Sequence, residues 1–277
     1  MTTAIIAPEL PRNPLARLGW VLADSWTLTL RGLSHWARNP TQILAGLAFP
    51  ILMVLLFGGI FGSGMQVEGG GDYMDFLMPG MFVMSMAFGI GETMAGVTAD
   101  ASKGVTDRFR SMPMSAASVV IGQSIVNMLY STVVLMILVG CGAIAGWSWS
   151  DGFMQALGAF ALLLLLRFAL LWVGIYLGLI IKTPEAASAV YTLLFPLGIV
   201  ANTFASPEMM PGWLATIAEW NPLSSTAHAT RELFGNPGVG GTSWIAEHAM
   251  LMSFVWPLAI FAVFFPLAVR KYRSLSR

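Results

Sequence analysis

Few side chains in this sequence could do chemistry, and none of them forms a known catalytic pattern. The sequence has no Gly-x-x-x-x-Gly-Lys-Ser/Thr phosphate loop and contains no Gly-Lys pair at all. Its three histidines lie far apart, and neither His-Glu-x-x-His nor Cys-x-x-Cys occurs. Ser206, Ser224 and Ser225 lie near acidic residues but outside any Gly-x-Ser-x-Gly turn. We therefore predict no catalytic residue, no metal site and no cofactor bound by this chain.

Two charged residues, Glu92 and Arg167, lie inside long apolar runs. An arginine in the middle of a membrane helix costs about 2.5–3.5 kcal/mol, so it is expected to face a polar partner. Counted from the outer ends of their runs, Glu92 and Arg167 lie roughly 24 and 21 Å deep at a rise of 1.5 Å per residue. The sequence therefore predicts a Glu92–Arg167 ion pair, which either locks two helices together or takes part in substrate passage or gating. The alternative is that the two side chains have separate, unpaired orientations.

A polar stripe accompanies this pair. Gln123, Asn127 and Ser131 recur every four residues, which places them on one face of a helix. Such stripes most often form hydrogen bonds with neighbouring membrane helices. The alternative is that the stripe lines a transport path.

The composition places most of the chain in a membrane. Of 277 residues, 56% are hydrophobic and only 10% charged, whereas soluble domains carry about 25% charged residues. A helix that crosses a bilayer needs about 20 mostly apolar residues. Six segments meet this need: residues 43–61, 76–99, 116–146, 153–181, 186–204 and 249–269. The predicted fold class is an all-α integral membrane protein with six transmembrane helices.

The positions of the lysines and arginines predict the orientation, because cytoplasmic loops are enriched in these residues. With the N-terminus inside, all but two of the fourteen fall in cytoplasmic segments. The exceptions are Arg231, in an outer segment, and Arg167, within a span. Both termini are therefore expected in the cytoplasm, with the protein in the cell (plasma) membrane.

Two regions outside the spans carry helical patterns. Near the N-terminus, apolar residues recur every three or four positions, at Leu18, Leu22, Trp26, Leu30, Leu33 and Trp36. This indicates an amphipathic helix lying in the cytoplasmic interface, or else an ordinary helix packed on the bundle. We assign residues 1–41 to a cytoplasmic N-terminal segment and residues 42–277 to a transmembrane domain. Before the last span, residues 213–220 and 222–234 are predicted to form short outer helices.

One cytoplasmic block is more specific than the rest. Residues 99–114 read ADASKGVTDRFRSMPM, with Ser115 placed to cap the next helix. The block resembles the signature of ABC-2 type transporter permeases, in particular the daunorubicin-resistance (DrrB-like) branch. That pattern has an acidic residue, Lys/Arg-Gly, Asp/Glu-Arg and then Arg-Ser-Leu/Met-Pro. A second block of the family, Asn-Pro followed by Arg, resembles Asn221-Pro222 and Arg231.

The resemblance implies that two permease chains pair, as a homo- or heterodimer, and that each binds a separate ATPase subunit that holds the ATP. It also implies that the loop after the second span couples the two subunits. By position, the residues that would contact or brace the ATPase are Asp100, Lys103, Gly104, Asp107, Arg108 and Arg110. The implied activity is efflux of hydrophobic or amphiphilic compounds, including antibiotics.

Other functions remain open at this stage. The same machinery exports lipid-linked glycans or polysaccharides in some relatives. From a different class come an ATP-independent secondary transporter, for which inverted repeats would be the sign, and a membrane sensor or anchor that transports nothing. Nothing in the sequence suggests nucleic-acid binding.

Overall fold

The computed structural model describes residues 14–38, 40–61, 72–102, 116–181, 183–237 and 243–274. In these residues the regular structure is helical, which confirms the predicted all-α class. The helices are α1 (Pro14–Arg38), α2 (Pro40–Phe61), α3 (Tyr73–Ser102), α5 (Ala116–Ile144), α6 (Phe153–Ile180), α7 (Pro184–Val200), the 3-10 turn η1 (Pro207–Met209), α8 (Gly212–Glu219), α9 (Pro222–Phe234), α10 (Trp244–Glu247) and α11 (Ala249–Ser274).

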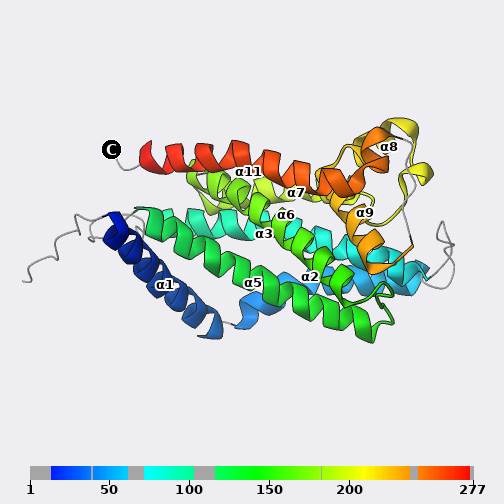
Figure 1. The fold of residues 1–277 in the computed structure, drawn as a ribbon, viewed down its shortest axis with the longest axis horizontal. Helices are drawn as coiled ribbons and strands as arrows, with labels where there is room; N and C mark the ends of the chain where they lie inside the picture. The colour runs from blue at the N-terminus through cyan, green and yellow to red at the C-terminus, as the bar shows by residue number, and fades with distance from the viewer. Residues whose placement is uncertain are drawn as a thin grey trace, which may run out of the picture.

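Each predicted span coincides with a helix of similar bounds. Four helical segments are long and apolar enough to cross a bilayer: Tyr73–Ala101, Ser118–Ile144, Phe153–Ile180 and Ala249–Tyr272. The other two predicted spans correspond to shorter apolar stretches, Gly46–Ile60 in α2 and Glu185–Val200 in α7. The long helices run beside one another, and α8 and α9 gather at the end opposite the C-terminal end of α11 (Figure 1).

Helix α3 forms the centre of the bundle. Its side chains Leu77, Met78, Met81 and Phe82 are completely buried. Glycines on α6 allow α3 to approach closely: a Cβ on Gly174 would lie 2.8 Å from the carbonyl oxygen of Ile90. Small residues at such crossings let helix backbones pack tightly in membranes. The α3–α6 contact fixes the level at which Arg167, two turns before Gly174, meets α3.

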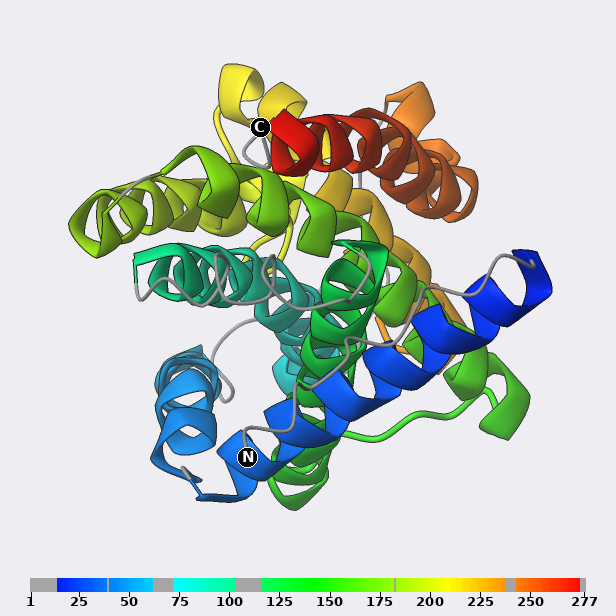
Figure 2. The same cartoon turned by 90° about the vertical axis from the view of Figure 1, so that its left-hand side faces the viewer.

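Helix α1 packs on α5 through small polar residues, whereas its apolar stripe stays uncovered. Ser25 and Thr29 are buried, and the Ser25 hydroxyl donates to the carbonyl of Ser118 on α5 at 3.2 Å. By contrast Leu22, Trp26 and Leu30 are 65%, 58% and 49% exposed. Figure 2 shows α1 crossing the face of α5 at an angle. The helix therefore packs on the bundle with one face and exposes three residues of its apolar stripe, and its position in the membrane interface stays a prediction.

The predicted short outer helices are also present. Helix α8 covers the stretch with Trp213 and Ile217, and α9 begins at Pro222 and ends at Phe234 as predicted. At the other end of the fold, α1 ends at Arg38 and α2 starts at Pro40. The proposed division between residues 41 and 42 thus falls in the first turn of α2.

Candidate functional site

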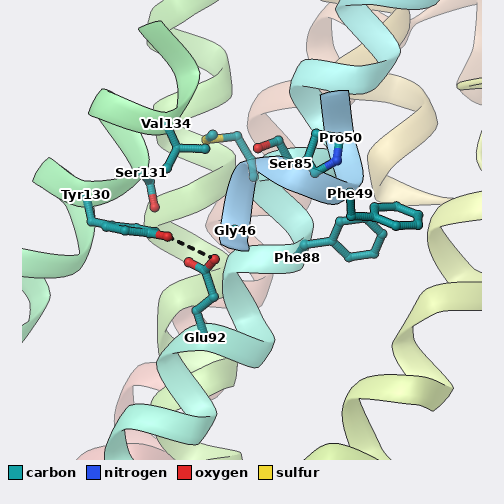
Figure 3. Close-up of a pocket in the computed structure, with 10 residues that line it drawn as sticks. Gly46, Phe49, Pro50, Ser85, Phe88, Glu92, Tyr130, Ser131 and Val134 are labelled. Atoms are coloured by element: carbon teal, nitrogen blue, oxygen red, sulfur yellow. Dashed lines mark hydrogen bonds between the residues drawn. The ribbon is translucent and has the colours of Figure 1, made fainter. Parts of the chain in front are cut away.

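A cavity of about 70 Å³ lies between α2, α3 and α5, and four of the side chains that line it are polar (Figure 3). Three helices supply its walls. The lining residues are Gly46, Phe49 and Pro50 from α2, Ser85, Met86, Phe88 and Glu92 from α3, and Tyr130, Ser131 and Val134 from α5. The cavity thus joins one carboxylate and several hydroxyl groups to an aromatic wall.

The Glu92 carboxylate points to the hydroxyl of Tyr130, as Figure 3 shows. Tyr130 donates to Glu92 Oε1 over 3.4 Å, whereas a hydroxyl bound to a carboxylate usually lies at about 2.5–2.7 Å. Gly46 faces both groups, and a Cβ there would lie 2.5 Å from the Tyr130 oxygen and 2.8 Å from Oε1. The absence of a side chain on Gly46 therefore lets the Tyr130 hydroxyl and the Glu92 carboxylate pack closely against α2.

Arg167 lies behind this cavity and is completely buried. Its Nε donates to Ser131 Oγ at 2.6 Å, and its Nη2 donates to Thr93 Oγ1 at 2.9 Å. Nη1 is buried with no hydrogen-bond partner in the described part of the chain. The guanidinium lies against Gly89, where a Cβ would be 2.5 Å from its central carbon. The buried Arg167 guanidinium is thus bound by two hydroxyl groups and packs against a glycine.

The predicted Glu92–Arg167 ion pair is not formed among the residues that the structure describes. The two side chains lie at the same level, since Thr93, the neighbour of Glu92 in sequence, binds Arg167. Successive residues point about 100° apart around a helix, however, so Thr93 faces α6 while Glu92 faces α5. The two residues thus lie at matching levels, and the direction of the Glu92 side chain explains why the pair is not formed.

Within the predicted polar stripe, only Ser131 lines the cavity. The Asn127 amide donates to the carbonyl of Gln123 on its own helix at 2.9 Å, and both residues are half-buried. Ser131 therefore belongs to the site, whereas Gln123 and Asn127 lie earlier along α5 and outside the cavity.

An aromatic cluster adjoins the cavity. Phe49 from α2 packs edge-to-face on Phe88 from α3 and on Phe195 from α7, each with ring centroids 5.4 Å apart. Phe88 and Phe195 stack nearly parallel, with centroids 5.9 Å apart. All three rings are only partly buried.

Four residues that sequence reasoning did not single out are central to the site: Gly46, Phe49, Phe88 and Tyr130. The available signal was a tyrosine beside Ser131 in an apolar run.

The predicted coupling residues fall almost entirely outside the described residues. Lys103, Gly104, Asp107, Arg108 and Arg110 lie there, and their roles stay predictions. Asp100 is described, in the last turn of α3, where it is half-buried.

Asn221 and Arg231, which match the second block of the family, form a brace: their hydrogen bonds connect α9 to neighbouring segments. Asn221 caps α9 by accepting from Leu223 N at 3.0 Å, and its amide donates to the carbonyl of Leu197 on α7 at 2.8 Å. The caps satisfy backbone groups that both helix ends leave open.

Arg231 completes this brace. It is fully buried and donates to the carbonyls of Phe76 and Asn202, each at 2.8 Å, with its guanidinium 3.9 Å from the Phe76 ring centre. Burial lowers the pKa of Arg231 from its usual value to about 9, so it remains charged at neutral pH.

Long apolar helices around a polar interior cavity define a helical integral membrane protein. Residues 24–234 match the ABC-2 type transporter family, and the chain belongs to it as a permease of ABC transporters. Daunorubicin resistance ABC transporter permease protein DrrB1 of Streptomyces coeruleorubidus is 30% identical over 275 residues, covering 99% of this chain and 93% of its own.

Two further relatives match over most of their length. Putative transport permease ycf38 of Cyanophora paradoxa is 23% identical, over 83% of this chain and 78% of its own. Probable doxorubicin resistance ABC transporter permease protein DrrC of Mycobacterium tuberculosis (strain CDC 1551 / Oshkosh) is 21% identical, over 86% and 88%. Membership in a family of ABC permeases implies an ATPase partner.

Proposed function

We propose that this chain is the membrane subunit of an exporter that moves hydrophobic or amphiphilic, drug-like compounds out of the cell. A separate subunit binds and hydrolyses the ATP, two permease chains pair, and each crosses the plasma membrane six times with both termini in the cytoplasm. The observation that carries the proposal is the match along 99% of the chain to a permease named for daunorubicin resistance.

The internal structure agrees with such a role. Members of this class need a membrane path that accepts apolar molecules, and the cavity beside the phenylalanine cluster offers an apolar surface with a few polar groups. Ligand sites are commonly of this kind, apolar walls with a small number of polar groups that orient the ligand.

Coupling to ATP is assigned to residues 100–110. Asp100 lies in the last turn of α3, which is the central helix of the bundle, so a push on this loop would be transmitted directly along α3. Closure of the ATPase would then change the packing of α3 against its neighbours, as expected when one rigid element moves against others.

The test is export of doxorubicin from cells that express the chain with its ATPase subunit. The Arg108→Glu variant should reach the membrane normally and retain doxorubicin in the cell, with ATP hydrolysis no longer linked to transport. Arg270→Glu, which reverses a basic charge in α11 outside the loop, is the matched control and should export normally. Unchanged drug tolerance of the Arg108→Glu variant, or transport by the purified chain alone, would refute the proposal.

A further inference from the structure

No described residue gives the Glu92 carboxylate a short hydrogen bond. Its hydrogen bond from Tyr130 is long, at 3.4 Å, and Arg167 bonds to Ser131 and Thr93 instead. Glu92 is nevertheless exposed at the surface of the isolated chain, so a molecule from outside the bundle can reach it. A carboxylate at membrane depth is costly unless a cation or several donors approach it.

An aromatic surface continues directly from this carboxylate. Phe88 lies one helical turn before Glu92, which places both on one face of α3. Phe49 lies against Phe88, and both rings line the same cavity as the carboxylate (Figure 3). Aromatic rings attract cations as well as flat apolar groups. The two features together therefore suit a molecule that is aromatic and positively charged.

The size of the cavity limits what it can hold. A volume of about 70 Å³ holds a small polar group but no large ring system, since one water molecule already needs about 10–15 Å³ of such space. A small charged amine head fits this cavity, where it would lie beside Glu92. The apolar body of the molecule would lie outside it, on the half-buried rings of Phe88 and Phe195.

We propose that the cavity is a binding site for the cationic head of an aromatic amphiphile, with Glu92 as the counter-ion and Phe49 and Phe88 as the wall. This inference deepens the proposed function, because it names the chemical class that the exporter takes. With the N-terminus inside, Gly46 lies near the cytoplasmic end of α2, so the molecule enters from the inner half of the membrane.

The inference is tested with two probes that differ in one charge: diphenylhexatriene and its trimethylammonium derivative. The purified full chain is placed in lipid nanodiscs, and saturable binding is measured by energy transfer from protein tryptophans to the probe. The wild-type chain should bind the cationic probe at least about tenfold more tightly than the neutral one, as expected for a charge-assisted contact. Glu92→Gln should abolish this preference, whereas Glu232→Gln, on the exposed side of α9, should retain it.

A second variant tests the same site independently, in case the Glu92→Gln protein does not fold. Gly46→Ala would displace the Tyr130 hydroxyl and the Glu92 carboxylate, so it should reduce binding of the cationic probe more than that of the neutral probe. A preference for the cation that survives in either the Glu92→Gln or the Gly46→Ala variant, or no preference in the wild type, overturns the inference. The measurement needs no ATPase, so a chain that keeps the preference but does not export doxorubicin would contradict the proposed function and leave the binding site standing.

Discussion

The arrangement of Arg167 shows how a charge is retained inside the bundle without a direct ion pair. Its guanidinium donates hydrogen bonds to the hydroxyl oxygens of Ser131 on α5 and Thr93 on α3. It also packs against Gly89 of α3. Hydrogen bonds to charged groups contribute more than neutral ones, and a buried donor left without its acceptor is costly. The hydroxyls of Ser131 and Thr93 therefore hold three helices at a fixed level.

Removing one of these hydroxyls should reduce stability. Ser131→Ala would leave Arg167 Nε without its acceptor, and we expect a loss of about 1–3 kcal/mol in the free energy of unfolding. Ser124→Ala on the same helix is the control, because that hydroxyl only donates to the carbonyl of Val120 at 2.8 Å. Thermal unfolding of both variants in detergent measures the difference. Equal unfolding temperatures for the two would show that the Arg167–Ser131 bond does not stabilise the fold.

The glycine beside Arg167 should tolerate no side chain. A Cβ on Gly89 would lie 2.5 Å from the guanidinium carbon, so Gly89→Ala forces Arg167 away from Ser131 and should cost about 1–3 kcal/mol. Gly96→Ala, seven residues further along α3, places its Cβ 4.0 Å from the nearest side-chain atom and should be neutral or slightly stabilising. Unfolding in detergent again gives the measurement, and a stable Gly89→Ala protein would contradict the described position of the guanidinium.

At the scale of the helix, α1 has three faces with separate tasks. The face with Ser25 and Thr29 packs on α5, the charged face meets water, and the face with Leu22, Trp26 and Leu30 remains uncovered. An uncovered apolar stripe on a helix at the edge of a membrane bundle is expected to enter the lipid interface.

This arrangement can be checked with spin labels on single cysteines in a Cys141→Ser background. A label on the Trp26→Cys variant should be reached by oxygen dissolved in lipid, because position 26 lies on the apolar face. A label on the neighbouring Thr27→Cys variant should be reached instead by a water-soluble nickel complex, since residue 27 is exposed on the polar side. Equal access of both reagents to both labels would place α1 in water rather than at the interface.

The sequence predicted the helices well and the site only partly. Apolar runs near membrane length mark α3, α5, α6 and α11, and Pro222 marks the start of α9. The site depends instead on which way each side chain turns, and this is set by packing between helices. Thr93 rather than Glu92 faces Arg167 because glycines on α6 fix the rotation of α3, which no spacing along one helix reveals.

At the scale of the whole molecule, the helices alternate in direction, so the loops gather at two ends. The loop before α6 lies at the end with α8 and α9, and the connection between α6 and α7 lies at the end where α11 finishes (Figure 1). The excess of lysine and arginine predicts that the second end faces the cytoplasm. The C-terminal end of α3, at which the proposed coupling block begins, lies at this same end because α3 runs parallel to α6 (Figure 1).

That assignment can be tested on each side of α6 with a membrane-impermeant maleimide. In a Cys141→Ser background, the Asp151→Cys variant should react in intact cells, because residue 151 is exposed in the outer loop. The Thr183→Cys variant, also exposed, should react only after the cells are permeabilised. Reaction of both in intact cells would mean that α6 does not span the membrane. Reaction of the Thr183→Cys variant alone would place residues 100–110 outside, where no ATPase bound in the cytoplasm could drive them.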